Sequence, residues 1–296
     1  MPELPEVTVY VEALERRIRG ATLERVRLQS PSLLKTFDPP ISAAEGQRVL
    51  GLRRMAKRIV WELDGELYMV FHLMITGRLR WRERGTAVPR KPGHAAFDFA
   101  NGSVLLTEAG RAKQASLHLV HGATSLASFE RGGIDPLEAS LEEFRTALVR
   151  ENRSLKRALT DQRILAGIGN AYSDEILLVA RLSPVKRTHQ LSEDELVRLY
   201  RAVRETLQGW TDRLRSEVGD GFPEKVTAFH PAMKVHGKYG QPCPQCGSPI
   251  QRIVYAANET NYCASCQTDG KLLRDRALSR LLKDDWPSTL EELEGG

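Results

Sequence analysis

The sequence predicts an α+β protein with three parts in order: a β-rich part, a helical part and a small hairpin that carries cysteines. After a first helix, short β-like runs dominate to about residue 120. From Ile134 the apolar residues recur at helical spacings. Near the C-terminus, four cysteines stand in two close pairs with short β-like runs between them. At 296 residues the chain is long enough for two domains and a small third one.

An amphipathic helix opens the chain. Its apolar residues recur at alternating spacings of three and four, and Gly20 follows them as a stop signal. A stripe of this kind packs against a core, so we expect the N-terminus to be a positioned group rather than a loose tail. The residues of the stripe are Leu4, Val7, Val11, Leu14 and Ile18.

Two pairs of β-like runs indicate hairpins in the first part. Ile59–Leu63 and Leu67–Phe71 are joined by Asp64-Gly65. A second pair is joined by Asn-Gly, which like Asp-Gly suits two-residue turns because its central positions tolerate positive φ. Several short strands at regular spacing predict a β-sandwich. The second pair consists of Phe97–Ala100 and Ser103–Leu106, with Asn101-Gly102 between them.

Two capping boxes mark helix starts in the second part. Ser140 stands three residues before Glu143, and Ser192 stands three residues before Glu195. The second box opens a long helix that ends at the glycine-rich stretch 219–221. Its buried stripe consists of Leu196, Leu199, Val203, Leu207, Trp210 and Leu214.

A glycine-containing turn, LAGIGNAYSDE, lies between two helical stretches at residues 165–175. Gly167 and Gly169 allow a tight turn that leaves backbone N–H groups exposed just before a helix, and Asn170 adds a side-chain amide. Such a turn can bind a phosphate group. Taken alone, it is better explained as a helix-to-helix turn that uses glycine for its geometry.

The first six residues, MPELPE, form a candidate catalytic group. Removal of Met1 would leave the free secondary amine of Pro2, which can attack an aldehyde carbon and form a charged iminium. Glu3 and Glu6 stand beside it for proton transfer. The helix N-terminus would favour the neutral, nucleophilic amine. The plain alternative is an ordinary terminus in which the proline begins a helix.

The four cysteines of the chain follow the spacing C-x2-C-x16-C-x2-C, which matches a closed tetrahedral zinc site. Two disulfides are the alternative, which dispersed cysteines and a signal peptide would favour. Two runs between the pairs, Gln251–Tyr255 and Thr260–Tyr262, predict a zinc-bound β-hairpin. The ligands of this site are Cys243, Cys246, Cys263 and Cys266.

The composition says less about function than the motifs do. The 43 basic and 38 acidic residues give a formal charge of +5 and a pI of about 9.1. This charge permits a nucleic-acid partner without requiring one. The chain has no run of eighteen apolar residues and no leader, so we expect a cytoplasmic protein with no membrane partner.

Taken together, these motifs resemble the formamidopyrimidine-DNA glycosylase and endonuclease VIII family of base-excision repair enzymes. The resemblance covers residues 2 to about 270 and rests on five stretches. They are PELPEV at the terminus, RRMAKRIVWEL at 53–63, FHLMITGRLR at 71–80, the stretch from Lys156 to Asn170 that ends in AGIGN, and PCPQCG with NYCASCQ around the cysteines.

The resemblance implies a fold with DNA in the cleft between two lobes. The catalytic β-sandwich domain with its N-terminal helix would cover residues 2–125, and a helix-two-turns-helix domain residues 134–228. The zinc β-hairpin would cover residues 236–270. The C-terminal segment 271–296 follows the hairpin. Its first part, KLLRDRALSRLLK at 271–283, predicts an amphipathic helix that docks on the protein, and residues 284–294 predict a solvated acidic tail.

The resemblance also implies catalytic roles. Pro2 matches the nucleophile that forms a Schiff base with the sugar C1′, and Glu3 matches the acid that protonates the sugar ring oxygen. Glu6 matches a supporting carboxylate. Lys57 matches the lysine that assists strand cleavage near the lesion phosphates. The plain alternative for Lys57 is a basic residue at a strand edge.

DNA contacts are implied at further positions. His94, seven residues before Asn101, matches a DNA-contacting histidine, and Lys156 and Asn170 match phosphate contacts. Ile75 stands where the family places a methionine in the gap left by the flipped base, and it can act as an apolar wedge. The plain alternatives are a surface loop for His94 and a solvent-directed side chain for Lys156.

Two departures from the family pattern concern DNA binding. The hairpin arginine that stands five residues before the third cysteine is replaced by Asn258, and an amide cannot replace a bidentate guanidinium on phosphate. The family's Arg-Arg-Phe stretch, which also inserts side chains into the gap left by the flipped base, is replaced by TEAGRAKQAS, in which Arg111 is the candidate for the surviving arginine. The loss of the hairpin arginine therefore favours weaker DNA binding and less of the second elimination, the step that would remove the residual sugar after the strand is cut.

Two functions follow from the resemblance. The first is a monomeric, bifunctional DNA glycosylase and abasic-site lyase that acts on oxidised or ring-opened bases and carries one structural zinc ion. The second is a protein that binds lesion or abasic DNA with weak or lyase-only activity. The PELPE terminus and Lys57 favour the enzyme, since binding alone needs neither. Asn258 favours the second function.

Overall fold

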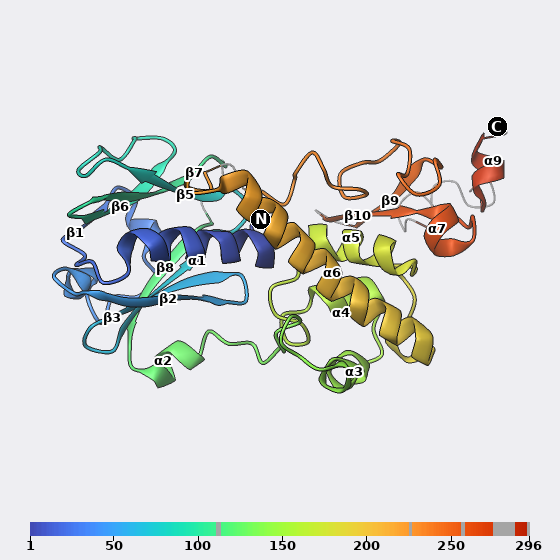
Figure 1. Ribbon diagram of the computed structural model, residues 1–296, viewed down its shortest axis with the longest axis horizontal. Helices are drawn as coiled ribbons and strands as arrows, with labels where there is room; N and C mark the ends of the chain where they lie inside the picture. Colours follow the sequence, from blue (N-terminus) through green and yellow to red (C-terminus); the bar gives the residue numbers. More distant parts are fainter. Residues whose placement is uncertain (111–113, 225–226, 256–257, 275–287, 295–296) are drawn as a thin grey trace. The chain divides into compact units, whose positions relative to one another are not determined.

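The computed structural model describes residues 1–110, 114–224, 227–255, 258–274 and 288–294. The chain forms two compact units (Figure 1). The first unit contains Met1–Arg131 and Trp210–Ala228, and the second contains Gly132–Gly209 and Phe229–Gly296. Over the described ranges, no helix has both the length and the apolar character needed to cross a membrane.

The first unit is a β-sandwich with a helix at its N-terminus. One sheet has the strand order β1-β6-β7-β5 and the other β2-β3-β4-β8, and all neighbouring strands are antiparallel. Its elements are α1 (Leu4–Ile18), β1 (Arg25–Leu28), η1 (Pro31–Leu33), η2 (Ile41–Ala44), β2 (Val49–Met55), β3 (Arg58–Leu63), β4 (Leu67–His72), β5 (Gly77–Arg82), β6 (Gly93–Phe99), β7 (Gly102–Glu108), β8 (Ser116–His121) and α2 (Ala123–Ala127). Both predicted hairpins are confirmed as β3–β4 and β6–β7.

Aromatic side chains from both sheets meet in the core of the sandwich. The Trp61 and Phe97 ring centroids are 5.3 Å apart, and those of Phe71 and Phe97 are 5.2 Å apart in an edge-to-face arrangement. Such pairs add packing energy to the burial of their large apolar areas. The whole predicted stripe of α1 is buried in this unit, and Gly20 follows at φ +79°. The core therefore fixes the helix that carries the N-terminus.

The second unit combines helices with the cysteine hairpin. Both predicted capping boxes form, at Ser140 with Glu143 and at Ser192 with Glu195. The predicted stripe of the long helix is buried along its whole length. The elements are α3 (Leu141–Val149), α4 (Leu155–Thr160), α5 (Asn170–Ala180), η3 (Thr188–Gln190), α6 (Glu193–Val218), β9 (Ile250–Tyr255), β10 (Asn258–Cys263), α7 (Ala264–Thr268) and α9 (Leu290–Glu294).

The last turns of α6 and the segment after it belong to the first unit, whereas the sequence predicted residues 210–228 as part of the helical domain. Side-chain contacts explain this division. Leu214 lies in the core of the sandwich, and Arg215 binds Glu12 of α1 at 2.6 Å. Arg82 of β5 donates to the Glu224 carboxylate through both terminal guanidinium nitrogens, Nη1 and Nη2.

The C-terminal segment differs from its prediction at both described ends. Lys271 pairs with Thr289 in a β-bridge, so the predicted helix does not begin at 271, and positions 275–283 lie outside the described residues. The expected solvated tail instead contains α9, whose Leu290 is buried against Tyr262 of the hairpin. Both described ends of the extension dock on the protein, because Leu272, Leu273 and Leu290 supply an apolar surface.

Candidate active site and nucleic-acid interface

The N-terminus is built into the start of α1. Pro2 is buried and precedes Glu3, the residue that caps the helix. The Glu3 backbone N–H donates to Glu6 Oε2 at 2.8 Å, which completes a capping box. Pro5, and not Pro2, occupies the first helical turn. Pro2 therefore does not serve as the helix-starting proline.

Charged side chains surround the terminal amine. This amine belongs to Met1, and removal of Met1 would transfer it to Pro2. Burial lowers the pKa of the Met1 amino group, Arg78 and Lys57 lower it further, and Glu3 and Glu6 act in the opposite direction. A lowered pKa leaves more of the amine neutral near pH 7, which is the form that attacks a carbon. Two carboxylates and two cations thus act on the same amine.

Lys57 lies in the turn between β2 and β3, next to Ala56, which has a φ of +52°. Its side chain is buried, with 9% of the residue's surface exposed. Burial, followed by the charges of Arg58 and Lys57, lowers the pKa of nearby His72 to about 4. His72 is therefore neutral near pH 7 and adds no positive charge beside Lys57.

Ile75 lies in the loop between β4 and β5 and is 53% exposed, so it presents an apolar side chain to solvent. The loop is fixed by Arg78, whose guanidinium donates to the Ile75 carbonyl at 3.2 Å and to the Gly77 carbonyl at 2.7 Å. The Gly110 N–H donates to Thr76 Oγ1 at 3.2 Å. Arg111, the other candidate for the gap, lies outside the described residues.

His94 lies inside the sandwich rather than on a surface loop. It is 1% exposed, and its Nε2 lies 2.9 Å from Glu108 Oε2. Glu108 also accepts hydrogen bonds from the backbone N–H groups of Gln114 and Ala115. Every residue of β6 is buried, and the other ring nitrogen of His94, Nδ1, has no hydrogen-bond partner among the described residues. His94 supports the segment that follows β7 through Glu108.

Lys156 and Asn170 come together at the start of α5. Lys156 Nζ donates to the Asn170 carbonyl at 2.7 Å and lies 2.5 Å from Asp174 Oδ1. The Lys156 side chain is 12% exposed and that of Asp174 is fully buried. The Asn170 amide donates to the Glu259 carbonyl of β10 at 2.9 Å. The predicted turn is present, with Gly167 at φ +94°.

Two buried acids of α5 attach the hairpin region to the helices. Asp174 Oδ2 lies 2.8 Å from His236 Nδ1 and accepts from the Asn261 backbone N–H at 3.2 Å. Glu175 accepts from three successive backbone N–H groups, those of residues 234–236. Because buried carboxylates without partners are costly, these bonds fix the loop before the cysteines.

Asn258 pairs through its backbone with Tyr255 at the end of the β9–β10 hairpin. Arg252 is a described cation on the neighbouring strand β9. It lies 3.3 Å from Glu259 Oε2 and 4.2 Å from the ring centroid of Tyr239. Arg252 is thus engaged with protein groups, although its side chain is exposed.

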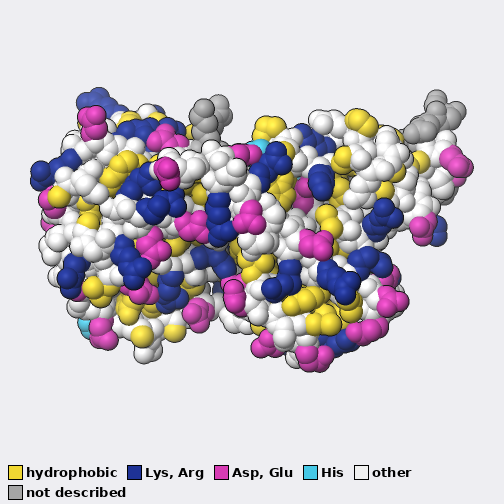
Figure 2. All heavy atoms as spheres, in the orientation of Figure 1, with side chains coloured by type: hydrophobic (Ala, Val, Ile, Leu, Met, Phe, Trp, Pro, Cys, Tyr) yellow, Lys and Arg dark blue, Asp and Glu magenta, His cyan; other side chains and the backbone are white. Residues whose placement is uncertain are grey.

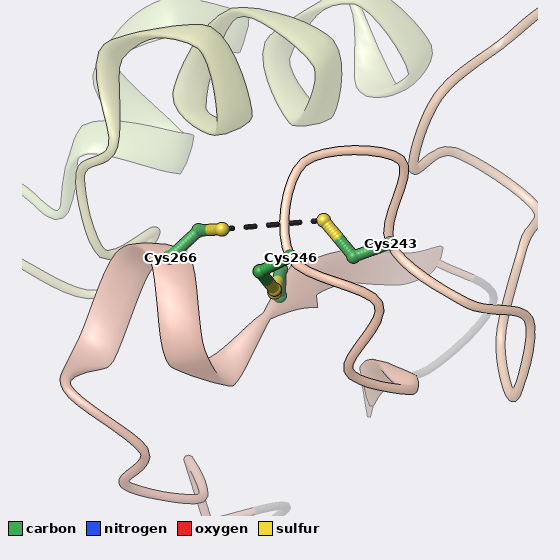
Figure 3. A group of neighbouring side chains, drawn as sticks. Cys243, Cys246 and Cys266 are labelled. Carbon is green, nitrogen blue, oxygen red and sulfur yellow. Dashed lines mark hydrogen bonds between the residues drawn. The ribbon is translucent and has the colours of Figure 1, made fainter.

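The four cysteines form one cluster, as their spacing predicts. Their sulfur atoms all lie within 4.8 Å of one another. The sulfur atoms of Cys243 and Cys266 are 4.0 Å apart (Figure 3), and those of Cys246 and Cys263 are 3.4 Å apart. A tetrahedral zinc site with Zn–S bonds of about 2.3 Å requires sulfur atoms about 3.8 Å apart. All four are free thiols, so the disulfide alternative is wrong. Burial raises the pKa of the Cys266 thiol to about 11, so metal binding has to displace protons.

The surface charge is mixed. On the face shown in Figure 2, basic and acidic side chains alternate over both units. This agrees with a formal charge of only +5. The described residues of this face form no large, uniformly basic patch (Figure 2), so an anionic ligand bound there would be positioned by individual side chains.

Three families of known protein domains match this chain, in the same order as the β-sandwich, the helical part and the cysteine hairpin. The formamidopyrimidine-DNA glycosylase N-terminal domain matches residues 1–114, the H2TH domain of the same enzymes residues 133–213, and the zinc finger found in FPG and IleRS residues 240–268. The formamidopyrimidine-DNA glycosylase of Heliobacterium modesticaldum is 35% identical over 90% of this chain and 100% of its own. The chain belongs to the formamidopyrimidine-DNA glycosylase family. It is therefore a base-excision repair DNA glycosylase with an α+β fold and a zinc finger.

Other relatives agree with this family membership. The formamidopyrimidine-DNA glycosylase of Thermus thermophilus is 33% identical over 91% of this chain and 100% of its own. The structure of Lactococcus lactis Fpg in complex with an abasic site containing DNA matches at a TM-score of 0.80, with 27% identity over 90% of this chain and 99% of that chain. Another L. lactis structure, with an N7-benzyl-Fapy-dG containing DNA, also matches at 0.80.

Several residues around these family positions were not singled out from the sequence. Arg78 acts on the terminal amine and fixes the Ile75 loop, and it stands inside the quoted motif FHLMITGRLR. Asp174 and Glu175 stand inside LAGIGNAYSDE, where two adjacent acids in an otherwise apolar helix are a signal of buried bonding. His236 and Glu108 had no comparable local signal.

Proposed function

We propose that this glycosylase, as a cytoplasmic monomer, removes oxidised or ring-opened bases from damaged DNA and then cuts the strand by β-elimination. The observation that carries the proposal is the partly buried N-terminal amine of Met1, next to the buried Pro2. Burial lowers the pKa of this amine, and the charges of Glu3, Arg78, Glu6 and Lys57 act on it. A buried amine with carboxylates and cations around it suits covalent catalysis at a sugar carbon.

The chemistry begins with the neutral amine of Pro2. Its lone pair forms a bond to C1′ of a flipped nucleotide, and the bond from C1′ to the base breaks. The base leaves with the electrons of that bond and takes up the proton that the Pro2 nitrogen loses. A proton from Glu3 to the sugar ring oxygen opens the ring and leaves an iminium between Pro2 and C1′. Glu6, which accepts a bond from the Glu3 N–H, holds the helix start in place.

The iminium then draws electrons from C2′. Loss of a C2′ proton breaks the bond from C3′ to the phosphate oxygen, which cuts the strand on the 3′ side of the lesion. Lys57, whose charge acts on the terminal amine, suits the role of holding the neighbouring phosphate. Water finally attacks C1′ of the iminium and frees Pro2.

The zinc hairpin, by this proposal, holds one structural Zn²⁺ through Cys243, Cys246, Cys263 and Cys266. The ion would fix the geometry of the hairpin and take no part in the reaction. Lys156, Asn170 and the hairpin end at Asn258 would contact DNA phosphates, and Ile75 with Arg111 would occupy the gap left by the flipped base. His94 would support this region through Glu108 rather than touch the DNA.

The alternative, a lesion-binding protein with weak or lyase-only activity, is favoured by Asn258 in place of the family arginine. Borohydride reduction on a panel of duplexes separates the two functions, because it traps only a covalent iminium. The panel contains ring-opened guanine, an oxidised pyrimidine, an abasic site and undamaged DNA. We expect trapped adducts with the damaged bases and the abasic site. Adducts at abasic DNA alone would establish a lyase, and binding without any adduct would establish the binding protein.

A further inference from the structure

An open cavity of about 680 Å³ on the second unit carries four arginines. Arg153 comes from the segment just before α4, Arg157 from α4, Arg187 from the segment after α5, and Arg274 from the C-terminal extension. The matched zinc-finger residues end at 268, so Arg274 belongs to the part of the chain beyond them.

The positive charge of this arginine cavity is only partly neutralised. Arg153 forms ion pairs with Glu151 and Asp161, and Arg187 donates to the Asn152 carbonyl at 3.3 Å. No carboxylate in the described part of the chain pairs with Arg157 or Arg274. Two guanidinium groups therefore face the cavity with their donors free for an anion.

The shape of the cavity favours a strand over an enclosed small molecule. Arg157 and Arg274 are exposed, and the apolar walls at Val185 and Val254 remain 48% and 42% exposed. A small ligand would be covered only on one side, whereas a nucleic-acid backbone needs an open surface that offers several cations. The planar fork of arginine also matches phosphate oxygens in a bidentate manner.

We propose that the arginine cavity binds the phosphate backbone of DNA outside the lesion, through Arg157 and Arg274. This inference rests on the proposed function, because it takes DNA as the ligand. It adds a second phosphate-binding region to Lys156, Asn170 and Asn258, the positions proposed above for phosphate contacts. Among those positions, the Lys156 ammonium is already bound to Asp174 and Asn170. The site raises affinity for DNA of any sequence and takes no part in bond breaking.

The test is the salt dependence of binding to an undamaged duplex of about 30 base pairs. In the double variant Arg157→Gln/Arg274→Gln, loss of two phosphate contacts makes the slope of log K against log salt shallower by about 1.8, since each contact contributes about 0.9. Binding at about 0.1 M salt weakens by roughly tenfold or more. The matched control Arg201→Gln replaces an exposed arginine of α6 and leaves the slope unchanged. Equal slopes for wild type and the double variant overturn the proposal.

Two further measurements keep the outcomes separate. The double variant Arg157→Lys/Arg274→Lys retains both charges and should therefore keep most of the salt slope. A loss of slope as large as that of the glutamine variant would overturn the electrostatic argument. Tripolyphosphate is the second probe: if it binds at micromolar concentration while duplex slopes stay equal, the ligand is a free oligophosphate and the proposal fails. Borohydride trapping at saturating DNA should be unaffected in all variants. Absence of trapping in the wild type would instead refute the proposed function.

Discussion

Replacing Asp174 by asparagine should destabilise the second unit more than any surface substitution. The carboxylate is fully buried and binds three groups: Lys156 Nζ at 2.5 Å, His236 Nδ1 at 2.8 Å and the Asn261 N–H at 3.2 Å. Asparagine has nearly the same shape, but one of its two polar atoms is a donor. At least one of the three donors then faces another donor, and the Lys156 charge loses its counterion.

The expected cost is about 3 kcal/mol, since removing one partner of a buried ion pair costs about 3–5 kcal/mol and the Lys156 side chain retains some exposure. A loss of this size lowers the folding equilibrium constant by roughly 150-fold. If an unpaired lysine causes most of it, Lys156→Met in the Asp174→Asn background should recover part of the loss. Such a pair of contacting residues shows a coupling energy of about 0.5–3 kcal/mol.

Urea unfolding of the zinc-loaded protein, followed by circular dichroism, gives the free energies of the four proteins in this cycle. Asp212→Asn is the matched control, because the Asp212 side chain is 56% exposed and pairs with Arg215 on the surface. We expect the control to change stability by less than about 0.5 kcal/mol. A loss below about 1 kcal/mol for Asp174→Asn, or no coupling with Lys156→Met, would show that this buried network does not hold the hairpin region to α5.

Three other substitutions test the zinc site, the terminal amine and the hairpin. Cys263→Ser should release zinc, measured by metal analysis, and weaken DNA binding while the β-sandwich stays folded; retained metal would rule out four-thiolate ligation. Arg78→Gln removes a charge that lowers the pKa of the terminal amine, so the rising limb of single-turnover trapping against pH should move to higher pH; an unmoved limb would exclude this electrostatic role. Asn258→Arg should steepen the salt slope of DNA binding by about 0.9 and increase removal of the residual sugar, whereas an identical slope would show that position 258 does not face a phosphate.

Local sequence patterns account for much of the fold. Both hairpins with their Asp64-Gly65 and Asn101-Gly102 turns, both capping boxes and the buried stripe of the long helix follow from interactions between residues close in sequence. The cysteine cluster was also predictable, because its spacing is set by the geometry of a single ion.

Contacts between residues far apart in the sequence explain the structural features that could not be predicted. Nothing near Arg215 indicates that its partner is Glu12, so the assignment of residues 210–228 to the first unit could not be foreseen. His94 stands in a strand that is buried on both faces, which local alternation cannot reveal. The extension at Lys271 was predicted as a helix from its leucines, but Leu272 and Leu273 pack on the hairpin next to a β-bridge.

The proposed reaction depends on the terminal amine of Pro2 as the nucleophile. Its most direct test is to trap the protein on abasic DNA with borohydride, digest the adduct and locate the sugar remnant by mass spectrometry. We predict the remnant on the N-terminal peptide that begins with Pro2, and no adduct when the terminus is blocked by an added residue. A remnant on Lys57 or another lysine, or undiminished trapping with a blocked terminus, would contradict the claim.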